Sequence, residues 1–345
     1  MKRGLVLEGG ALRGLFSAGV MDVLMEHGVR FDGVVGVSAG ACFGCNYKSH
    51  QTGRVLRYNL RYAHDPRYCS VWSLLTTGGI FGPHFAYYAL PQRLDPFDIS
   101  AFDSDPMEFH LVATDVQTGE AVYRRFDRFR PDMYEWILAS SSMPLVSRVV
   151  TIGDQQLLDG GIADSIPLRY FQDQGFERNL VVLTQPANYH KTPLRHPRLV
   201  RHLLSRYPRF VDAWLRRHEM YNAELRYIAE QQAAGRCLIL CPDSTLPVGR
   251  ISHNRRHMRQ AYQLGRDLAT AQLPRILAYL DQDELPDGTP DLTKSFVGAD
   301  VMIAPAEEVV AVNTTSIDST SKAIGDGVFT KSCGCGSSAG IANHL

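Results

Sequence analysis

Short apolar runs alternate with helical patterns along the first fifty residues of the chain. The run Leu5-Val6-Leu7 has the character of a buried strand, because it is short and stops at glycines. Over residues 16–27 apolar residues recur at helical spacing, and Gly28 is placed to end this helix in a left-handed cap. Residues 34–37 form a second apolar run, which leads into Ser38 and another helix. This order predicts an α/β fold with parallel strands joined by a right-handed crossover.

The rest of the chain continues the mixture of strands and helices. Further buried strands are predicted over residues 108–113, 180–184 and 238–240. Two short runs, 149–152 and 155–158, flank Gly153-Asp154, a two-residue turn that favours a β-hairpin. The second strand of this hairpin ends at Asp159.

Between residues 191 and 219 many positive charges are interleaved with apolar residues. The basic residues are Lys191, Arg195, Arg198, Arg201, Arg206, Arg209, Arg216 and Arg217, against Asp212 and Glu219. The apolar residues are Leu199, Leu203, Leu204, Phe210, Trp214 and Leu215. Two interpretations fit this pattern: a solvated helical pair with an apolar core face, or a basic amphipathic surface that rests on anionic lipid.

The composition changes near Pro290, beyond which the chain is rich in Ser, Thr, Gly and Ala and loses its periodicity. We therefore predict one domain over residues 1–290, with a helical part at about 190–285, and a weakly structured or disordered tail at 291–345. The Cys333-Gly334-Cys335 segment lies in this tail. We expect exposed thiols there, because too few further metal ligands are near.

Charge and cysteine content narrow the class of protein. Lys plus Arg equals Asp plus Glu at 36 each, so no nucleic-acid partner is expected. Seven cysteines do not suit a secreted disulfide framework and favour reduced thiols in the cytoplasm. The first apolar run is too short for a signal peptide, and no run approaches the ~18 apolar residues of a membrane span. We expect a cytoplasmic location, with peripheral membrane contact if the basic region is a lipid surface.

Gly36-Val37-Ser38-Ala39-Gly40 has the G-x-S-x-G form of a nucleophile elbow. Ser38 must lie on a tight turn between strand and helix, strained enough to expose its hydroxyl. Gly36 and Gly40 remove side chains that would clash across that turn. The helix that begins at Ala39 points its positive end toward developing negative charge. The predicted strand before the motif and the helix after it supply the context that the motif requires.

A glycine-rich segment, Gly9-Gly10-Ala11-Leu12-Arg13-Gly14, also joins a strand to a helix. Its backbone N–H groups suit an anion, either a nucleotide phosphate or the oxyanion of acyl transfer. Leu15 and Phe16 replace the Lys and Ser/Thr of a phosphate-binding loop, and Ala11 replaces a glycine of the dinucleotide fingerprint. Asp32 lies at about the distance of a ribose-binding acid, so a weak nucleotide alternative stays open. The neighbouring elbow favours the oxyanion.

A third motif, Asp159-Gly160-Gly161, is ordinary turn chemistry when it is taken alone. In combination, the three motifs resemble those of the patatin-like phospholipases and acyl hydrolases in order and spacing. Segments 112–115 and 139–144 are also similar to the bacterial members of that family. The resemblance covers roughly residues 3–285.

The resemblance implies a three-layer α/β/α fold with a mainly parallel central sheet, and a catalytic Ser–Asp dyad without histidine. Ser38 would attack an ester carbonyl while Asp159 takes the serine proton. The implied oxyanion hole is lined by Gly9, Gly10, Ala11, Arg13 and Gly14, and the motifs are supported by Gly36, Gly40, Gly160 and Gly161. The implied substrate is a phospholipid or a related lipid ester, and the chemistry requires no cofactor and no metal.

Two residues depart from the family pattern. Ala11 replaces the third glycine of the loop, which would tighten the oxyanion hole or shift its donors. Ser165 replaces an Asn that commonly follows Asp-Gly-Gly, which weakens the expected support of that loop.

Other interpretations stay open. An ordinary α/β-hydrolase would use Ser-Asp-His with His190 or His253, although that fold places several strands before the elbow. A catalytically inactive protein would use the glycine-rich loop to bind a lipid or a nucleotide. Cys42 and Cys45 lie one helical turn apart, a spacing that suits half of a zinc site. We prefer the alternative that they are apolar packing residues on a buried helix.

Overall fold

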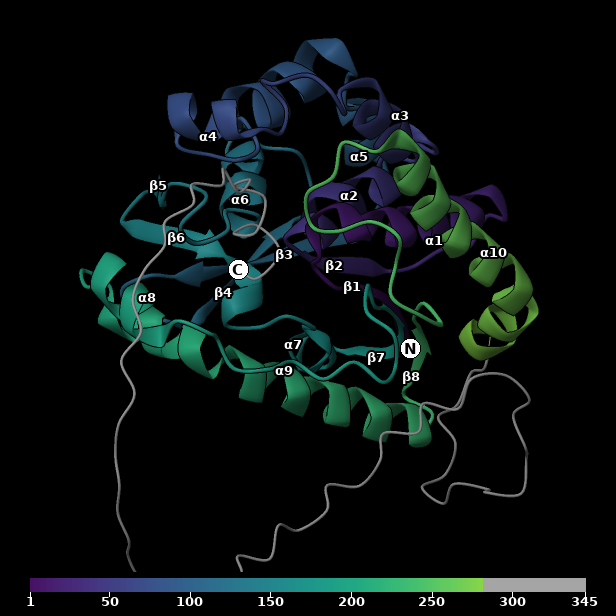
Figure 1. Cartoon of the computed structure of the whole chain (residues 1–345). Coiled ribbons are helices and arrows are strands. Elements are labelled where there is room, and N and C mark those ends of the chain that lie inside the picture. Colours follow the sequence, from purple (N-terminus) through teal and green to yellow (C-terminus); the bar gives the residue numbers. More distant parts are fainter. Residues whose placement is uncertain (282–345) are drawn as a thin grey trace, which may run out of the picture.

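One mixed sheet runs through the middle of the protein and carries helices on both faces (Figure 1). The computed structural model describes residues 1–281, so the predicted tail at 291–345 and its two cysteines lie outside the described residues. The strands are β1 (Lys2–Leu7), β2 (Gly33–Val37), β3 (Glu108–Asp115), β4 (Ala121–Phe126), β5 (Val150–Ile152), β6 (Gln155–Asp159), β7 (Phe176–Val182) and β8 (Cys237–Leu240). The α-helices are α1 (Leu15–Glu26), α2 (Ala39–Lys48), α3 (Arg54–Arg61), α4 (Val71–Thr77), α5 (Ile99–Ser104), α6 (Met133–Ser140), α7 (Leu168–Asp173), α8 (Pro197–Leu203), α9 (Pro208–Ala233) and α10 (Arg255–Leu280). Short 3-10 turns η1 (Ala11–Gly14) and η3 (Gly160–Ile162) and a wider π-helix, η2 (Phe85–Leu94), complete the set.

The sheet has the strand order β5-β6-β3-β2-β1-β7-β8, with β4 paired to β3. Strand β1 pairs in parallel with β2 and β7, β2 with β3, and β7 with β8. The pairs of β3 with β4, β3 with β6, and β5 with β6 are antiparallel. The prediction of a mainly parallel sheet is thus confirmed, and so is the β5–β6 hairpin around Gly153.

Alternate residues of the central strands face different layers of helices. In β1, Leu5 and Leu7 belong to the core that contains α1, α2 and α10, whereas Val6 packs with α7 and α9. All three side chains are fully buried, as expected for a parallel strand that is covered on both faces. Figure 1 places α7 and α9 below the sheet and α1, α2 and α10 above it, so the three-layer α/β/α architecture is confirmed.

Helices α1 and α10 cross so closely that glycine is required at both contact points. A Cβ atom at Gly19 would overlap the carbonyl of Tyr262, and one at Gly265 would overlap the carbonyl of Phe16. The Tyr262 hydroxyl also donates a 2.6 Å hydrogen bond to Asp22. These contacts fix the last described helix onto the first one.

The basic region of the sequence forms the predicted helical pair, α8 and α9. Phe210 and Trp214 are buried in a core under the pair, whereas Leu199 and Leu203 of α8 are each more than half exposed. The pair therefore has the apolar core face of the first interpretation. It also carries exposed apolar side chains beside basic ones, which the second interpretation requires.

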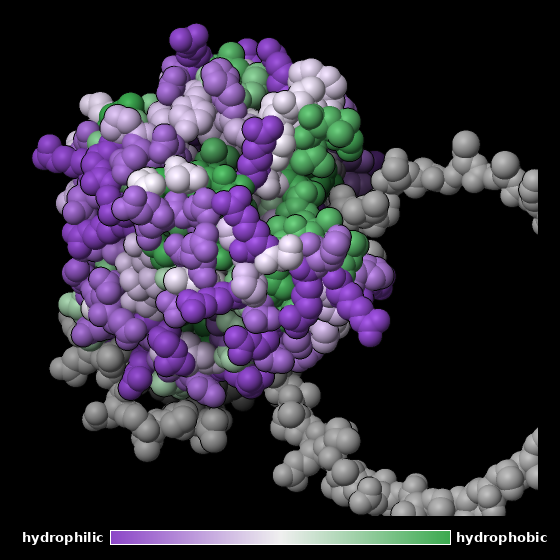
Figure 2. Space-filling view, turned by 90° about the vertical axis from the view of Figure 1, so that its left-hand side faces the viewer, coloured by the Kyte–Doolittle hydropathy of each residue, from purple (hydrophilic) through white to green (hydrophobic). Residues whose placement is uncertain are grey.

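Helix α4 presents apolar side chains to solvent. Val71, Trp72 and Leu75 are 66%, 54% and 80% exposed. Figure 2 views the face of the molecule on which Figure 1 labels α4 and α8, and hydrophobic surface gathers there in a band. Contiguous exposed apolar surface of this kind marks an interaction site. Within residues 1–281, no helix combines the length and apolar content needed to cross a membrane.

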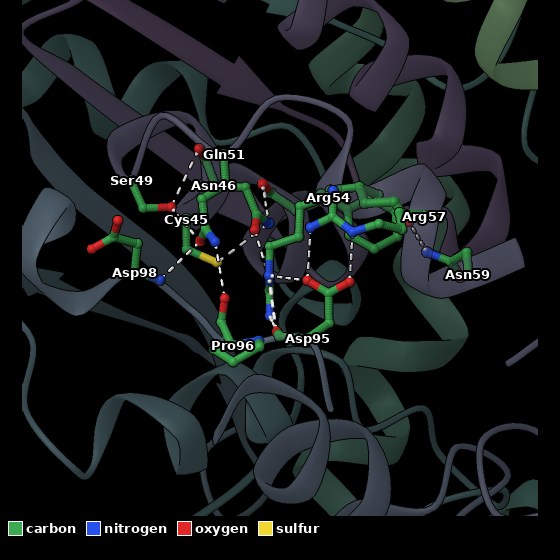
Figure 3. A network of polar contacts seen from close by, with 12 residues as sticks. Cys45, Asn46, Ser49, Gln51, Arg54, Arg57, Asn59, Asp95, Pro96 and Asp98 are labelled. Carbon is green, nitrogen blue, oxygen red and sulfur yellow. Dashed lines mark hydrogen bonds and ion pairs between the residues drawn. The ribbon is translucent and has the colours of Figure 1, made fainter. Parts of the chain in front are cut away.

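A buried ion pair holds α3 to the segment before α5 (Figure 3). Arg54 Nε lies 3.3 Å from Asp95 Oδ1, and both side chains are almost fully buried. Arg57 binds the same carboxylate through two hydrogen bonds of 2.8 Å, and Arg54 Nη1 donates to Asn46 Oδ1 at 2.7 Å. Without Asp95, the Arg54 guanidinium would be a buried charge without its carboxylate.

We expect Asp95→Ala to lower the free energy of unfolding by about 3–5 kcal/mol, the usual cost of removing one partner of a buried ion pair. The matched control is Asp65→Ala, which removes the partner of the exposed Arg67 and should cost about 1 kcal/mol or less. Urea unfolding followed by circular dichroism measures both values. Equal losses for the two variants would contradict a structural role for the buried pair.

Candidate active site

One edge of β3 is shared by β2 and β6, and this arrangement brings Ser38 and Asp159 together. Val37, the last residue of β2, pairs with Val112, and Asp159, the last residue of β6, pairs with the next residue, Ala113. Strand β4 pairs along the opposite edge of β3. Strand β6 therefore pairs with the same edge of β3 as β2 does, just beyond the point where β2 ends. The two strands run toward each other and end at adjacent positions. Two residues 121 positions apart in the chain thus become neighbours.

Ser38 lies at a strained turn between β2 and α2. Its φ of 55° and ψ of −118° are unusual for a residue with a side chain. A Cβ atom at Gly36 would overlap the backbone of Gly40, and one at Gly40 would overlap the carbonyl of Leu7. Only glycine fits at these two positions, and α2 begins directly after Ser38 at Ala39. This is the geometry of a nucleophile elbow.

The hydroxyl of Ser38 donates a 2.7 Å hydrogen bond to Asp159 Oδ2. The other carboxylate oxygen, Oδ1, accepts a 2.9 Å hydrogen bond from the N–H of Gly161. Ser38 and Asp159 are each only 6% exposed. Burial raises the pKa of Asp159, while the hydrogen bond from Ser38 and the charges of Arg217 and Arg250 oppose this rise. Asp159 is therefore a carboxylate of raised basicity in direct contact with a serine hydroxyl.

The loop that carries Asp159 is held by backbone packing and by side-chain hydrogen bonds. A Cβ atom at Gly160 would overlap the carbonyl of Val112. Ser165 Oγ donates a 2.7 Å hydrogen bond to the carbonyl of Gly161. Arg217 of α9 donates from Nε to the same carbonyl, and from Nη2 to Ser165 Oγ at 3.4 Å. Ser165 and Arg217 thus supply support in the place where the sequence lacks the expected Asn.

The glycine-rich loop lies against the turn that carries Ser38. A Cβ atom at Gly9 would lie 3.0 Å from the Cβ of Ser38, and one at Gly10 would lie 2.6 Å from Thr184 Oγ1. Ala11 has a φ of 49°, in the left-handed region that favours glycine. The backbone at Ala11 therefore has the conformation that a third glycine would adopt. A Cβ atom at Gly14 would crowd α2, so Gly14 lets the loop approach the helix that follows Ser38.

Glu8 anchors the start of this loop. Its buried carboxylate accepts hydrogen bonds from the N–H and hydroxyl of Thr184 at 2.5 and 3.0 Å. A third hydrogen bond, of 2.7 Å, comes from the hydroxyl of Tyr221 on α9. Thr184 Oγ1 also lies 2.9 Å from the carbonyl of Gly9, so its single hydroxyl hydrogen is shared between this carbonyl and Glu8. Residues from the segment after β7 and from α9 therefore fix the glycine-rich loop in position.

Three backbone donors of the loop are unused. The N–H groups of Gly9, Gly10 and Ala11 make no hydrogen bond to another residue within 1–281, whereas that of Leu12 donates to the carbonyl of Arg250 at 3.3 Å. Successive free N–H groups in a turn form a site for an anion. Because the loop adjoins Ser38, an anion held there would lie next to the serine oxygen.

Ser38 lies at the junction of two cavities. The first has a volume of about 110 Å³ and is mainly apolar. Its walls include Leu12, Phe43, Tyr58, Tyr68, Phe81, Tyr87, Leu90, Phe97, Met133 and Ile137. The second has a volume of about 190 Å³ and contains Asp159 and the glycine-rich loop. Four basic residues also line it: Arg13, Lys191, Arg217 and Arg250.

Neither histidine of the Ser-Asp-His alternative reaches this site. His190 Nε2 lies 3.1 Å from Asn222 Nδ2, and His253 Nδ1 lies 2.6 Å from the carbonyl of Ala63. Neither residue lines the two cavities at Ser38. The carboxylate of Asp159 occupies the position beside the hydroxyl that a catalytic histidine would need.

Cys42 and Cys45 line the apolar cavity. Burial raises the pKa of Cys42 to about 12 and that of Cys45 to about 11, so both thiols are neutral. Among residues 1–281, no group of three or more potential metal ligands is present. The packing interpretation of this pair fits its surroundings.

Sequence reasoning did not assign Lys191, Arg217 or Arg250 to the site. Lys191 and Arg217 were counted in the basic region, but they line the cavity instead of facing solvent. One signal was available for Arg217. It follows Phe210 and Trp214 at the helical spacing of buried residues, whereas its neighbour Arg216 is exposed.

Several known proteins are similar to this chain. The uncharacterized protein YjjU of Escherichia coli strain K12 is 26% identical over 280 residues, which cover 76% of this chain and 74% of that protein. Lysophospholipase NTE1 of Cryptococcus neoformans is 25% identical over 195 residues, or 54% of this chain and 12% of its own length. Lysophospholipase nte1 of Emericella nidulans is 29% identical over 185 residues, which cover 50% of this chain and 11% of that protein. The chain thus spans only about a tenth of the fungal enzymes.

Among solved structures, VipD from Legionella pneumophila is similar with a TM-score of 0.40 and 12% sequence identity. The match covers 79% of this chain and 67% of that one.

Two family models match separate parts of the chain. Residues 207–281 match a domain of unknown function, DUF6363. Residues 5–171 match the model described as patatin-like phospholipase, and they contain the glycine-rich loop, the elbow and the Asp-Gly-Gly motif. With these motifs at one end of a mainly parallel sheet between two helical layers, residues 5–171 form a patatin-like phospholipase domain.

Proposed function

We propose that this protein is a serine acyl-ester hydrolase for phospholipids or related lipid esters, with Ser38 as nucleophile and Asp159 as base. The observation that carries the proposal is the 2.7 Å hydrogen bond from Ser38 Oγ to Asp159 Oδ2. This pair lies where an apolar cavity meets a polar one. The patatin-like phospholipase domain and the names of the fungal relatives support lipid hydrolysis.

Acylation begins when Ser38 Oγ attacks the ester carbonyl carbon and its proton passes to Asp159. The C–O bond of the resulting tetrahedral intermediate then breaks, and Asp159 returns the proton to the departing alcohol. In the second half of the reaction, water attacks the acyl-serine and gives a proton to Asp159. Ser38 takes this proton back as the fatty acid leaves.

The unused N–H groups of Gly9, Gly10 and Ala11 would stabilise the oxyanion of each tetrahedral intermediate. A single oxyanion donor is worth roughly 2.7–4 kcal/mol of transition-state stabilisation. Glu8 and Thr184 hold the loop before the substrate binds, so little reorganisation is needed during the reaction. Burial of Asp159 raises its pKa toward the range in which a carboxylate is an effective base.

The lining of the apolar cavity supports the proposal that the acyl chain of the substrate binds there. Its aromatic and aliphatic walls offer no charge to a hydrocarbon except the guanidinium of Arg54, and that group is engaged by Asp95. Transfer of a chain from water into such a cavity is favourable by about 0.8 kcal/mol per buried CH₂. Esters with longer chains should therefore bind more tightly until the cavity is filled.

We also propose that the face with α4 and α8 rests on a membrane surface. Val71 and Leu74 of α4 line the second cavity, and Trp72 and Leu75 beside them are exposed. Exposed leucines of α8 stand among basic residues that suit anionic lipid. Contact through this face would bring the entrance of the site to the lipid layer.

Ser38→Ala and Asp159→Asn are each expected to reduce lysophospholipid hydrolysis by roughly 10⁴-fold or more, because a nucleophile and its base act as a unit. Labelling with a fluorophosphonate should occur at Ser38 in the wild-type protein and be slow in Asp159→Asn. The matched control is Asp154→Asn, in the exposed hairpin turn, which should keep wild-type turnover. Near-wild-type turnover by Asp159→Asn would show that another group is the base.

We expect kcat/KM to fall as the pH drops through the pKa of Asp159, because only the carboxylate accepts the serine proton. Since burial raises this pKa, the acid limb should lie above the ordinary Asp value of about 3.9. Arg217→Met removes a charge that lowers this pKa, so its acid limb should move to higher pH. Arg216→Met, on the exposed side of α9, is the control. An acid limb that stays fixed in Arg217→Met would exclude Asp159 as the titrating base.

The double substitution Trp72→Ala, Leu75→Ala should weaken binding to anionic vesicles by about tenfold or more, because two large apolar side chains are lost from the contact. Co-sedimentation with vesicles measures this change. Leu264→Ala removes an exposed leucine from α10 instead and should leave vesicle binding unchanged. Equal vesicle binding by all three proteins would contradict the proposed orientation.

A further inference from the structure

The second cavity beside Ser38 collects positive charge from four distant parts of the chain. Arg13 comes from η1, Lys191 from the segment after β7, Arg217 from α9, and Arg250 from the segment before α10. A third cavity, of about 170 Å³, adjoins this one and shares the last three of these residues. The fold therefore brings four basic side chains together next to the proposed nucleophile.

These four basic side chains form no ion pairs within the described residues. No carboxylate within residues 1–281 lies within 4.0 Å of any of them. The Nε atom of Arg13 is buried and has no hydrogen-bond partner within the described part of the chain. Lys191 Nζ lies 4.3 Å from the ring centre of Tyr221. The cavity thus contains donors that its own residues leave unused.

The two carboxylates that line the cavity are already occupied. Glu8 accepts hydrogen bonds from Thr184 and Tyr221, and Asp159 accepts them from Ser38 and Gly161. Neither carboxylate is available as a close partner for the basic side chains.

Burial and the neighbouring positive charges both lower the pKa values of two of these side chains. Burial, together with the charges of Arg217, Arg250 and Arg13, lowers the pKa of Lys191 to about 6, although Glu8 opposes this. Its amine is therefore largely neutral at pH 7 without a bound anion and takes up a proton when an anion binds. Burial and the same neighbouring arginines lower the pKa of Arg250 to about 10. A bound anion would reverse both effects, because it would give each cation an opposite charge at short range.

The chemistry of the donors indicates which anion fits. Guanidinium groups present paired N–H donors that match the oxygens of phosphate, and an ammonium adds a compact charge. In a glycerophospholipid, the phosphate is joined to the acyl ester through the glycerol carbons. A substrate with its acyl chain in the apolar cavity and its carbonyl at Ser38 would carry the phosphate into the cavity with the four basic side chains.

We propose that Lys191, Arg217 and Arg250, together with Arg13, bind the phosphate of the substrate's headgroup and make the enzyme selective for phosphate-bearing lipid esters over neutral acylglycerols. This inference rests on the proposed hydrolase function. In this arrangement the side chains of Lys191 and Arg250 bind the headgroup, and the charge of Arg250 also lowers the pKa of Asp159. Arg217 has a second role, because it also positions the loop of Asp159.

A matched pair of substrates tests the proposal: 1-oleoylglycerol 3-phosphate and 1-oleoylglycerol, which share one acyl ester and differ by the phosphate. The wild-type protein should prefer the phosphate-bearing lipid in kcat/KM by about tenfold or more, the effect of a charge-assisted hydrogen bond. Lys191→Met and Arg250→Gln should each reduce kcat/KM for that lipid by roughly 10- to 100-fold. The reduction of kcat/KM that these two variants show on 1-oleoylglycerol should be about tenfold smaller. Arg216→Gln removes a charge from the exposed side of α9 and should change neither value.

Failure of this proposal differs from failure of the hydrolase function. If the wild-type protein hydrolyses both lipids equally and the variants lose both equally, the headgroup site is wrong while the hydrolase stands. If Ser38 is not labelled by a fluorophosphonate and neither lipid is hydrolysed, the hydrolase is wrong. In that case, binding of 1-oleoylglycerol 3-phosphate to Ser38→Ala, measured by calorimetry, tests the site directly. Loss of this binding in the Ser38→Ala, Arg250→Gln protein supports the site, and unchanged binding overturns it.

Inorganic phosphate distinguishes a headgroup from a free ion. It should inhibit hydrolysis of 1-oleoylglycerol 3-phosphate weakly and competitively, and this inhibition should be lost in Arg250→Gln. If inorganic phosphate binds as tightly as the phosphate-bearing lipid and that lipid is not preferred as a substrate, the cavity is a site for free phosphate and the headgroup proposal is overturned.

Discussion

The pairing along β3 is the constraint on which the site depends. One edge of β3 pairs first with a parallel strand and then, beyond Val112, with an antiparallel strand that arrives from the opposite direction. The ends of β2 and β6 can meet only because both strands are in register with the same partner. A shift of one residue in either strand would turn its side chains to the other face of the sheet. The contact between Ser38 and Asp159 is thus set by backbone hydrogen bonds, before any side-chain preference acts.

The electrostatic balance at Asp159 follows from this placement. Burial favours the neutral acid, while the cations of the second cavity favour the carboxylate. For the base that we propose, either influence alone would be unfavourable, since a fully desolvated acid would stay protonated and a strongly paired one would be too weakly basic. Arg217 contributes to the balance in two ways, because it hydrogen-bonds the loop and also places its charge near the carboxylate. Arg217 therefore affects both the position of the Asp159 loop and the pKa of Asp159.

Much of this arrangement could be predicted from local patterns. The strand before Ser38, the hairpin that ends at Asp159 and the cap at Gly28 all depend on short sequence signals, and the structure confirms these elements. The charged wall of the second cavity could not be predicted in this way. Lys191, Arg217 and Arg250 are distant from the motifs in the chain, and only the packing of α9 and of the segment before α10 turns them toward Ser38. The apolar cavity has a similar origin, because many of its walls come from helices and loops between residues 54 and 137, outside the three motifs.

The central position of β1 has a consequence for how such proteins diverge. Strand β1 pairs with β2 on one side and with β7 on the other, yet β7 lies outside the stretch that matches the patatin-like model. Without β7, the middle of the sheet would become an unprotected edge. The second matched stretch contributes Arg217, which donates to the loop of Asp159, and Gly265, which contacts α1. The two matched stretches are therefore not interchangeable modules: a lineage that replaced one would have to change the other with it, and they are expected to be inherited as a single unit.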